Sequence, residues 1–301
     1  MGLFGGIEAG GTKFVCIVGC DSDNIIAEKR IPTTTPDETI RKSMEFFRPY
    51  TATGELSAIG IASFGPLDLN PDSKTYGHIT TTPKLTWQNT DLCGWIQQGL
   101  RVPVTFDTDV NAAAFGEYYW NKEKCQVDPI VYMTVGTGIG VGAIVHGKPL
   151  HGLVHPEAGH FALPHNWRRD PFPGVCPFHG DCLEGLASGP ALTKRWGQKP
   201  EALSADHPAW DLEAEYLGLA TINLIYAYSP KKIVLGGGVL QHPGLIDKIR
   251  SVVQQFNQGY VHSDLLLNQI ETYVHLPTLG TRSGVLGALA MAISSCTSVK
   301  N

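Results

Sequence analysis

The sequence predicts an α/β protein of two lobes. At 301 residues with 43% hydrophobic content, the chain exceeds the usual size of one compact domain and can bury a sizeable core. Two stretches, one in each half, run from a β-rich segment through a glycine turn into another β-rich segment. Between them, a strand ends in two aspartates and continues into an alanine-rich helix. Because α/β proteins place ligands at the carboxyl ends of strands, these aspartates mark a candidate site.

The first glycine turn lies in GGIEAGGTKFVCIVG, residues 5–19. The adjacent Gly10 and Gly11 allow a tight turn and a close approach to a ligand, and amides in such a turn can receive phosphate oxygens. A Walker loop is excluded, because the order here is Gly-Thr-Lys and β-branched and aromatic residues follow it instead of a helix. From this segment alone, an ordinary β-hairpin and a phosphate-binding turn both stay open.

The second glycine turn lies in YMTVGTGIGVGAIVHGK, residues 132–148. Its spacing matches G-x-G-x-x-A through Gly138, Gly140 and Ala143, which is part of a dinucleotide-binding fingerprint. However, residues 144–147 indicate a strand that ends in a turn, where that fingerprint needs a helix. The segment therefore repeats the strand-turn-strand pattern of the first turn.

The strand with the two aspartates lies in VPVTFDTDVNAAAFGEYYW, residues 102–120. It carries Asp107 and Asp109 to its carboxyl end, and the alanine-rich run from Asn111 predicts a helix. Either aspartate could be a helix cap, and that interpretation suits Asp107 best. We expect the chemistry at Asp109.

A third glycine cluster ends the apolar strand of KKIVLGGGVLQ, residues 231–241. Residues at helical spacing follow it, among them Leu245, Ile246 and Ile249. A strand, three glycines and a helix can form a flat shelf against a planar ligand, and they can equally form a structural turn.

Two cysteines and four histidines lie in the proline- and glycine-rich stretch 155–182. Cys176, His179 and Cys182 are separated by two residues each, and His160 lies upstream of them. Zinc favours four tetrahedral sulfur and nitrogen ligands, so this spacing predicts a structural zinc site. His155 and His165 are the competitors of His160 for the fourth position. The alternative is a loop of surface histidines beside a buried thiol pair.

Charge and composition exclude several classes of function. The net charge is −5 and no basic stripe is visible, so nucleic acid is not an expected partner. The start lacks the pattern of a signal peptide, no apolar run of membrane-spanning length occurs, and Gly6 replaces the Ser or Thr of a myristoylation motif. We therefore expect a cytoplasmic protein. The seven scattered cysteines do not indicate a disulfide framework.

These segments together resemble the ROK family of bacterial sugar kinases and repressors. The resemblance lies in EAGGTKF at 8–14, EAGH at 157–160, PFHGDCLEGLASGPA at 177–191 and GGGV at 236–239. It covers nearly the whole chain in order and is greatest with the zinc-containing bacterial fructokinase branch. It implies a two-lobed actin/hexokinase-like (ribonuclease H-like) ATPase fold with a zinc-binding loop, and a homodimer.

The resemblance also implies roles for individual residues. ATP and its phosphates would be bound by Gly11, Thr12, Lys13, Gly136, Thr137, Gly138, Pro190, Gly236, Gly237 and Gly238. Glu8 stands where many relatives have Asp and would approach Mg²⁺. The sugar would be held by Gly65, Thr108, Asp109, Glu157, His160 and Glu184. The zinc ligands would be His160, Cys176, His179 and Cys182, so that His160 serves both the metal and the sugar.

The implied activity is ATP-dependent phosphorylation of a hexose at its primary hydroxyl, with Asp109 as general base. Fructose is the expected hexose. Thr108 stands where glucose-type relatives tend to have Asn, which disfavours glucose, and mannose, glucose and N-acetylhexosamine are the alternative substrates. A catalytically inactive sugar sensor is a further alternative. A repressor is not expected, because the first strand begins too close to Met1 for a helix-turn-helix domain.

We expect an N-terminal lobe over residues 1–117 and a C-terminal lobe over 118–301, with the apolar segment TRSGVLGALAMAISSC at 281–296 forming a helix that could pack back on the first lobe. Residues 77–87, which end in Trp87, are a candidate lid over the sugar, and an ordinary connecting loop is the alternative.

Overall fold

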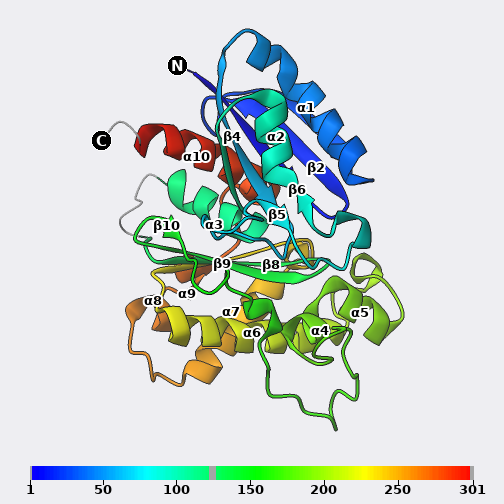
Figure 1. The fold of residues 1–301 in the computed structure, drawn as a ribbon. Helices are drawn as coiled ribbons and strands as arrows, with labels where there is room; N and C mark the ends of the chain where they lie inside the picture. Colours follow the sequence, from blue (N-terminus) through cyan, green and yellow to red (C-terminus); the bar gives the residue numbers. More distant parts are fainter. Residues whose placement is uncertain (1, 122–126, 299–301) are drawn as a thin grey trace. The chain divides into compact units, whose positions relative to one another are not determined.

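The computed structural model describes residues 2–121 and 127–298 (Figure 1). The chain divides into two compact units. Unit 1 consists of Met1–Lys124, Lys148–His155 and Arg282–Asn301, and unit 2 consists of Cys125–Gly147 and Pro156–Thr281. The chain therefore enters unit 1 three times, an arrangement that a single boundary between residues 117 and 118 does not describe.

Unit 1 is built on a five-stranded sheet in the order β3-β2-β1-β4-β7. Strands β1, β2 and β3 form an antiparallel meander, whereas β4 and β7 run parallel to β1. The strands are β1 (Leu3–Ala9), β2 (Lys13–Gly19), β3 (Ile25–Pro32), β4 (Leu56–Ser63) and β7 (Val104–Thr108). Strands β2 and β4 are mostly apolar and are buried on both faces apart from one exposed residue each, as expected of strands covered by helices.

Helices cover both faces of this sheet. They are α1 (Pro36–Ala52), α2 (Leu92–Leu100), α3 (Asp109–Tyr119) and α10 (Ser283–Ser298). A Cβ added at Gly5 would lie 2.8 Å from the Phe47 ring of α1, and one added at Gly6 would lie 2.9 Å from the Val285 carbonyl of α10. Successive residues of a strand face opposite sides, so α1 and α10 pack on opposite faces. α10 also packs along α3.

Residues 77–87 fold into unit 1. They include β5 (His78–Ile79), which pairs with β6 (Thr90–Asp91), and the 3₁₀ helix η1 (Leu85–Trp87). Trp87 is fully buried, its ring contacts Phe14 and Phe64, and its Nε1 donates to the Thr34 carbonyl at 2.9 Å. The expectation that Trp87 belongs to a lid is therefore wrong, because an aromatic ring held in the core cannot swing over a ligand.

A second five-stranded sheet has the order β10-β9-β8-β11-β12, and unit 2 contains its strands β8, β9, β11 and β12. When the strands of each sheet are numbered by their order in the chain, both sheets have the spatial order third, second, first, fourth, fifth. In both sheets, the first two strands form an antiparallel hairpin, and the first strand also pairs with a parallel strand. The strands are β8 (Ile130–Val135), β9 (Ile139–Val145), β10 (Lys148–Pro149), β11 (Lys232–Gly236) and β12 (Val274–His275). The topology is thus duplicated, although no sequence repeat is visible.

The helices of unit 2 surround long α6, which packs against α4 and α7. They are α4 (Leu183–Ala187), α5 (Gly189–Trp196), α6 (Ala209–Tyr228), α7 (Leu245–Asn257), α8 (Asp264–Leu267) and α9 (Ile270–Tyr273), with 3₁₀ turns η3 (Ala158–His160), η4 (Pro200–Ala202), η5 (Val239–Gln241) and η6 (Gly280–Arg282). Within the described residues, no helix combines the length and apolarity needed to cross a membrane.

Candidate active site and metal centre

The first glycine turn connects β1 and β2 as an antiparallel hairpin. Gly10 N donates to the Lys13 carbonyl at 3.0 Å, and Thr33 Oγ1 donates to the Gly10 carbonyl at 2.7 Å, which fixes the turn from β3. Gly11, Thr12 and Lys13 are exposed, and a Cβ added at Gly11 would meet nothing within 4 Å. The strand-turn-strand prediction is confirmed, and the turn presents its backbone to solvent, as a phosphate-binding turn must.

Asp109 is the first residue of α3 and directly follows β7. Thr108 is the N-cap, and its Oγ1 accepts from Asn111 N at 3.1 Å. Asp109 Oδ1 accepts from its neighbour Val110 N at 2.9 Å, and the side chain is half-buried. Its carboxylate therefore lies at the carboxyl edge of the sheet and at a helix N-terminus, where backbone amides stabilise its negative charge.

Asp107 has a different role from the expected helix cap. It is buried, and its carboxylate accepts from Thr108 N at 2.7 Å and from Asn111 Nδ2 at 2.8 Å. Its second oxygen lies 2.9 Å from His151 Nε2. The two residues are 44 positions apart in the sequence. Asp107 therefore connects the start of α3 to segment 148–155. The sequence offered no spacing signal for His151.

The contact with Asp107 raises the pKa of His151, mainly through the hydrogen bond and against the opposing effect of burial. A histidine with a raised folded-state pKa stabilises the fold below its unfolded pKa of about 6.5, and this stability is lost as pH rises through the higher folded value. We expect His151→Gln to lower the free energy of unfolding more at about pH 5.5 than at about pH 8.5. Because His151 is 41% exposed, solvent screening limits the effect to roughly 1 kcal/mol or less.

Denaturant unfolding at the two pH values measures this difference. In an Asp107→Asn background, His151→Gln should have the same effect at both pH values, because the charge partner is gone. An equal loss at both pH values in the wild-type background would show that the pair is not an ion pair.

Glu8 lies on β1, and its half-buried side chain lies beside Gly284 at the start of α10. Burial raises its pKa to about 7, and the negative charge of Asp109 adds to this, whereas Lys13 and a hydrogen bond from the backbone of Val285 oppose it. The positive charge of Lys13 and the hydrogen bond from Val285 therefore do not fully balance the negative charge of an ionised Glu8. Carboxylate oxygens are the ligands that Mg²⁺ prefers, so Glu8 and Asp109 fit a cation that would supply the missing charge.

The second glycine turn connects β8 and β9 in unit 2, and it is also an antiparallel hairpin. Gly136 N donates to the Gly138 carbonyl at 2.9 Å. Glu184 of α4 holds the turn, because its Oε2 accepts from Ile139 N at 2.9 Å, and a Cβ added at Gly138 would lie 2.6 Å from that oxygen. After β9, His146 and Gly147 turn the chain with positive φ. This confirms the turn that excluded a dinucleotide-binding fingerprint.

The three glycines at the end of β11 lie against the same hairpin. Gly237 has a φ of 94°, and a Cβ there would clash with the carbonyl of Val135 at the end of β8. Gly189 N, at the start of α5, donates to the Gly136 carbonyl at 2.8 Å. The structure therefore gathers the second glycine turn, Pro190 and Gly236–Gly238 at one end of the sheet of unit 2, and the role of these residues at adenosine stays a prediction.

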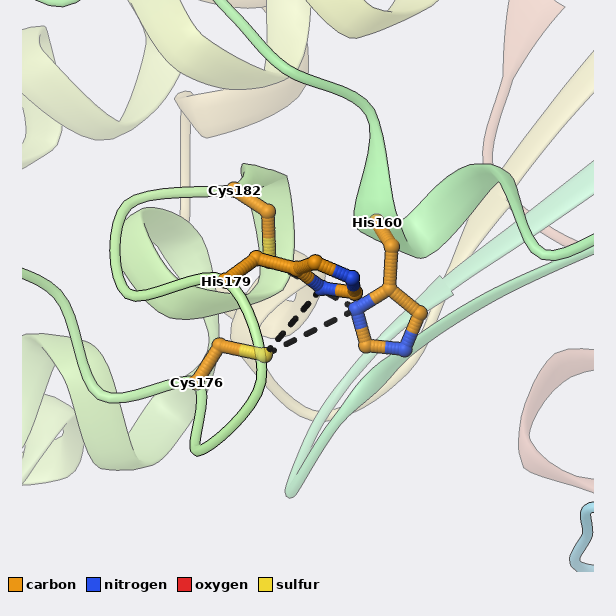
Figure 2. Close-up of side chains that lie close together, drawn as sticks. All are labelled: His160, Cys176, His179 and Cys182. Atoms are coloured by element: carbon orange, nitrogen blue, oxygen red, sulfur yellow. Dashed lines mark hydrogen bonds between the residues drawn. The ribbon is translucent and has the colours of Figure 1, made fainter.

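The four predicted metal ligands converge in unit 2 (Figure 2). His160 Nδ1 lies 3.8 Å from Cys176 Sγ and 3.5 Å from Cys182 Sγ, and His179 Nδ1 lies 3.6 Å from Cys176 Sγ. A sulfur atom and a nitrogen atom that bind the same zinc ion tetrahedrally at ordinary bond lengths are about 3.6 Å apart. The donor set and these three spacings therefore fit zinc.

Local backbone geometry holds these ligands. His160 ends the turn η3, and Cys182 precedes α4. Cys176 and Gly180 exchange backbone hydrogen bonds of 3.2 and 3.0 Å, and Gly180 has a positive φ of 65°. Burial, with a contribution from Cys176, raises the pKa of Cys182 to about 11. Two adjacent thiols in this environment need a cation to become thiolates, which is the state in which zinc binds them.

The competing histidines have other partners. His165 Nδ1 lies 2.9 Å from Asp181 Oδ2, and its Nε2 lies 2.9 Å from the Asp170 carbonyl. Asp170 is buried and also binds Arg195 at 3.1 Å and the Tyr216 hydroxyl at 2.6 Å. This network, which sequence reasoning missed, fastens the segment between His160 and Cys182 to α5 and α6. His155 belongs to unit 1, where its Nε2 lies 3.8 Å from the position of a Cβ on Gly65.

Glu157 and His160 lie one turn apart, because His160 N donates to the Glu157 carbonyl at 3.0 Å. Glu157 is exposed. His160 directs Nδ1 toward the two sulfurs (Figure 2), so a metal bound there would leave the Nε2 side of the ring for another ligand. The local geometry thus permits the double role that the sequence suggested for His160.

Comparison with known proteins decides the family. The model of the ROK family matches residues 4–295. The chain belongs to the ROK family. Among ROK relatives, it is 44% identical over 294 residues to a fructokinase of Lactococcus lactis subsp. cremoris, with 97% of each chain covered, and 43% identical over 303 residues to a fructokinase of Zymomonas mobilis, again with 97% of each covered.

Among solved structures, the ROK hexokinase from Thermus thermophilus superposes with a TM-score of 0.77 at 26% identity, covering 98% of this chain and 99% of the other. The fold is thus the actin/hexokinase-like fold of ROK sugar kinases. The duplicated strand order described above is the core of that fold, and the paired glycine hairpins of the sequence were its signal.

Proposed function

We propose that this ROK protein is an ATP-dependent fructokinase that phosphorylates the 6-hydroxyl group of D-fructose. The observation that carries the proposal is the similarity, over nearly the whole chain, to several proteins named fructokinase at 40 to 44% identity. The matches cover 96 to 97% of this chain and therefore span both units, including the segments with the glycine hairpins, Asp109 and the four metal-ligand candidates. They therefore support a shared reaction as well as a shared fold.

Asp109 is proposed as the general base. Phosphoryl transfer to an alcohol requires little covalent chemistry from the protein, but it requires a positioned acceptor and removal of the hydroxyl proton. A half-buried carboxylate on the first turn of a helix, directly after a sheet strand, is held rigidly enough for this role. Glu157, His160 and Glu184 are proposed to bind sugar hydroxyls, with Gly65 and Thr108 lining the sugar pocket.

The two glycine hairpins are proposed to bind ATP. The exposed backbone of Gly11 and Thr12, together with Lys13, would receive phosphate oxygens, as would Gly136, Thr137 and Gly138 in unit 2. Pro190 and Gly236–Gly238 would contact adenosine. Mg²⁺, when bound with ATP, supplies positive charge to the phosphates, and Glu8 is the carboxylate proposed to hold it. Zinc bound by His160, Cys176, His179 and Cys182 would be structural.

An assay of ADP release with a panel of hexoses tests the proposal. We expect the highest kcat/KM for fructose, ahead of mannose, glucose and N-acetylhexosamine, because Thr108 replaces the Asn of glucose-type relatives. A higher kcat/KM for another hexose would contradict the substrate assignment and leave the kinase assignment intact. Purified protein that binds a hexose but turns over none would instead identify a sugar sensor.

A homodimer in the cytoplasm is the expected state of the protein, on the basis of the family resemblance. Light scattering at several protein concentrations tests the dimer, and a mass of one chain at all of them would contradict it.

A further inference from the structure

The Glu8 side chain lies against the backbone of Gly284 at the start of α10. A Cβ added at Gly284 would lie 2.6 Å from Glu8 Oε1 and 2.7 Å from its Cδ. The backbone of the next residue, Val285, donates a hydrogen bond to the same carboxylate. Since the first amides of a helix have no partner within the helix, Glu8 satisfies one of them and only glycine leaves it the space to do so.

The backbone of α10 cannot move aside for a larger residue at position 284. A Cβ at Gly6 of β1 would lie 2.9 Å from an α10 carbonyl oxygen, and one at Gly60 of β4 would collide with another. A Cβ at Gly287 of α10 would in turn collide with the backbone of α3. The helix thus touches two strands and a helix backbone to backbone. An added methyl group at 284 must therefore be accommodated by the Glu8 side chain.

The start of α10 is also fixed by a second carboxylate. Ser283 Oγ donates to Glu117 Oε1 of α3 at 2.9 Å, and both side chains are buried. Arg282 forms an ion pair with Glu28 of β3 at 3.2 Å. The first turn of α10 is therefore held from α3 and from β3, independently of Glu8. It is a fixed surface against which the flexible side chain of Glu8 is placed.

We propose that Gly284 is a positioning residue for Glu8, which keeps the carboxylate at the place from which it serves the Mg²⁺ of the ATP complex. The inference rests on the proposed function, in which Glu8 is the metal-side carboxylate. Gly284 itself touches neither ATP nor sugar. Its contribution is the absence of a side chain, combined with the amide of Val285 that orients the carboxylate.

The test is Gly284→Ala in two backgrounds. In the wild-type background, we expect turnover to fall by up to about 10²-fold, because a displacement of a catalytic group by about 1 Å can lower the rate by that factor. The Mg²⁺ concentration that gives the half-maximal rate should rise, because the Glu8 carboxylate is displaced. Binding of Mg·ADP, measured by titration calorimetry, should weaken in parallel. In a Glu8→Asp background, the carboxylate is one methylene shorter and avoids the added methyl, so Gly284→Ala should cost less than about threefold.

Gly152→Ala in the same unit is the matched control, because a Cβ there would meet nothing within 4 Å; it should leave turnover and Mg·ADP affinity unchanged. Equal losses from Gly284→Ala in both backgrounds, or no loss in either, would overturn the inference. Should Gly284→Ala alone not fold, recovery of folded protein by Glu8→Asp supports it, and a double variant that also fails to fold overturns it. Wild-type protein inactive on every hexose refutes the proposed function instead, while the calorimetric comparison still decides the role of Gly284.

Discussion

Asp109→Asn should abolish most of the turnover while sugar and ATP still bind. Asparagine keeps the shape of the side chain and can still accept a hydrogen bond from Val110 N, but it lacks the basic oxygen that takes the proton of the sugar hydroxyl. Loss of a general base lowers the rate by roughly 10²–10⁴-fold. Single-turnover kinetics and binding titrations with the purified variant separate the loss of rate from a loss of affinity.

Asp107→Asn is the matched control, because Asp107 lies on β7 only two residues before Asp109. Asp107 accepts hydrogen bonds from Thr108, Asn111 and His151, so its replacement should cost stability on the order of 1 kcal/mol more clearly than rate. Near-normal turnover in a folded Asp109→Asn variant would show that the base is wrongly assigned, and Glu157 is the next carboxylate to test. Loss of sugar affinity at an unchanged limiting rate would make Asp109 a binding residue.

Removal of metal should unfold part of unit 2. A structural zinc typically contributes on the order of 10 kcal/mol to the fold that contains it. The four ligands hold together η3, the loop that carries Cys176 and His179, and the start of α4. We expect chelator-treated protein to lose one equivalent of zinc and to melt at a lower temperature, as measured by elemental analysis and by calorimetry.

Cys182→Ala should reproduce the effect of the chelator without any chelator present. Cys93→Ala is the control, because Cys93 is a buried thiol of α2 in unit 1, remote in sequence from the ligands. It should keep its zinc and lose only the small packing contribution of one sulfur atom. Purified protein that contains no zinc, or a melting temperature that the chelator does not change, would contradict the prediction of a structural zinc site.

Features with a short sequence span could be predicted from the sequence. The two glycine hairpins, the strand that ends at Asp109 and the Cys176–Cys182 ligand spacing are local patterns, because all their parts lie within a few residues. His160 is distant from the other metal ligands in the sequence, and its role as a ligand was predicted from the family resemblance. The structure brings its Nδ1 to within 3.8 Å of the sulfur atoms of Cys176 and Cys182.

Contacts between distant residues could not be predicted in this way. His151 meets Asp107 only because segment 148–155 returns to unit 1, and Glu8 meets Gly284 only because α10 does. Trp87 was misjudged for a related reason: a tryptophan in a polar stretch suggests exposure, but the core that buries it consists of residues such as Phe14 and Phe64 on other elements. Single-sequence patterns carry no information on which distant elements cover one another.

The return of the last helix to unit 1 has a consequence for synthesis of the chain on the ribosome. All of unit 2 lies within residues 125–281, whereas unit 1 needs residues 282–298 to cover the glycine-lined face of its sheet. Because a nascent chain emerges from its N-terminus onward, unit 1 cannot be completed before residues 282–298 have been synthesised. Until then, β1 and β4 present an apolar face without its helix, so this unit is the part of the nascent chain most open to chaperones and proteases. A released chain truncated after residue 281 should thus yield a protected fragment of unit 2 alone on limited proteolysis.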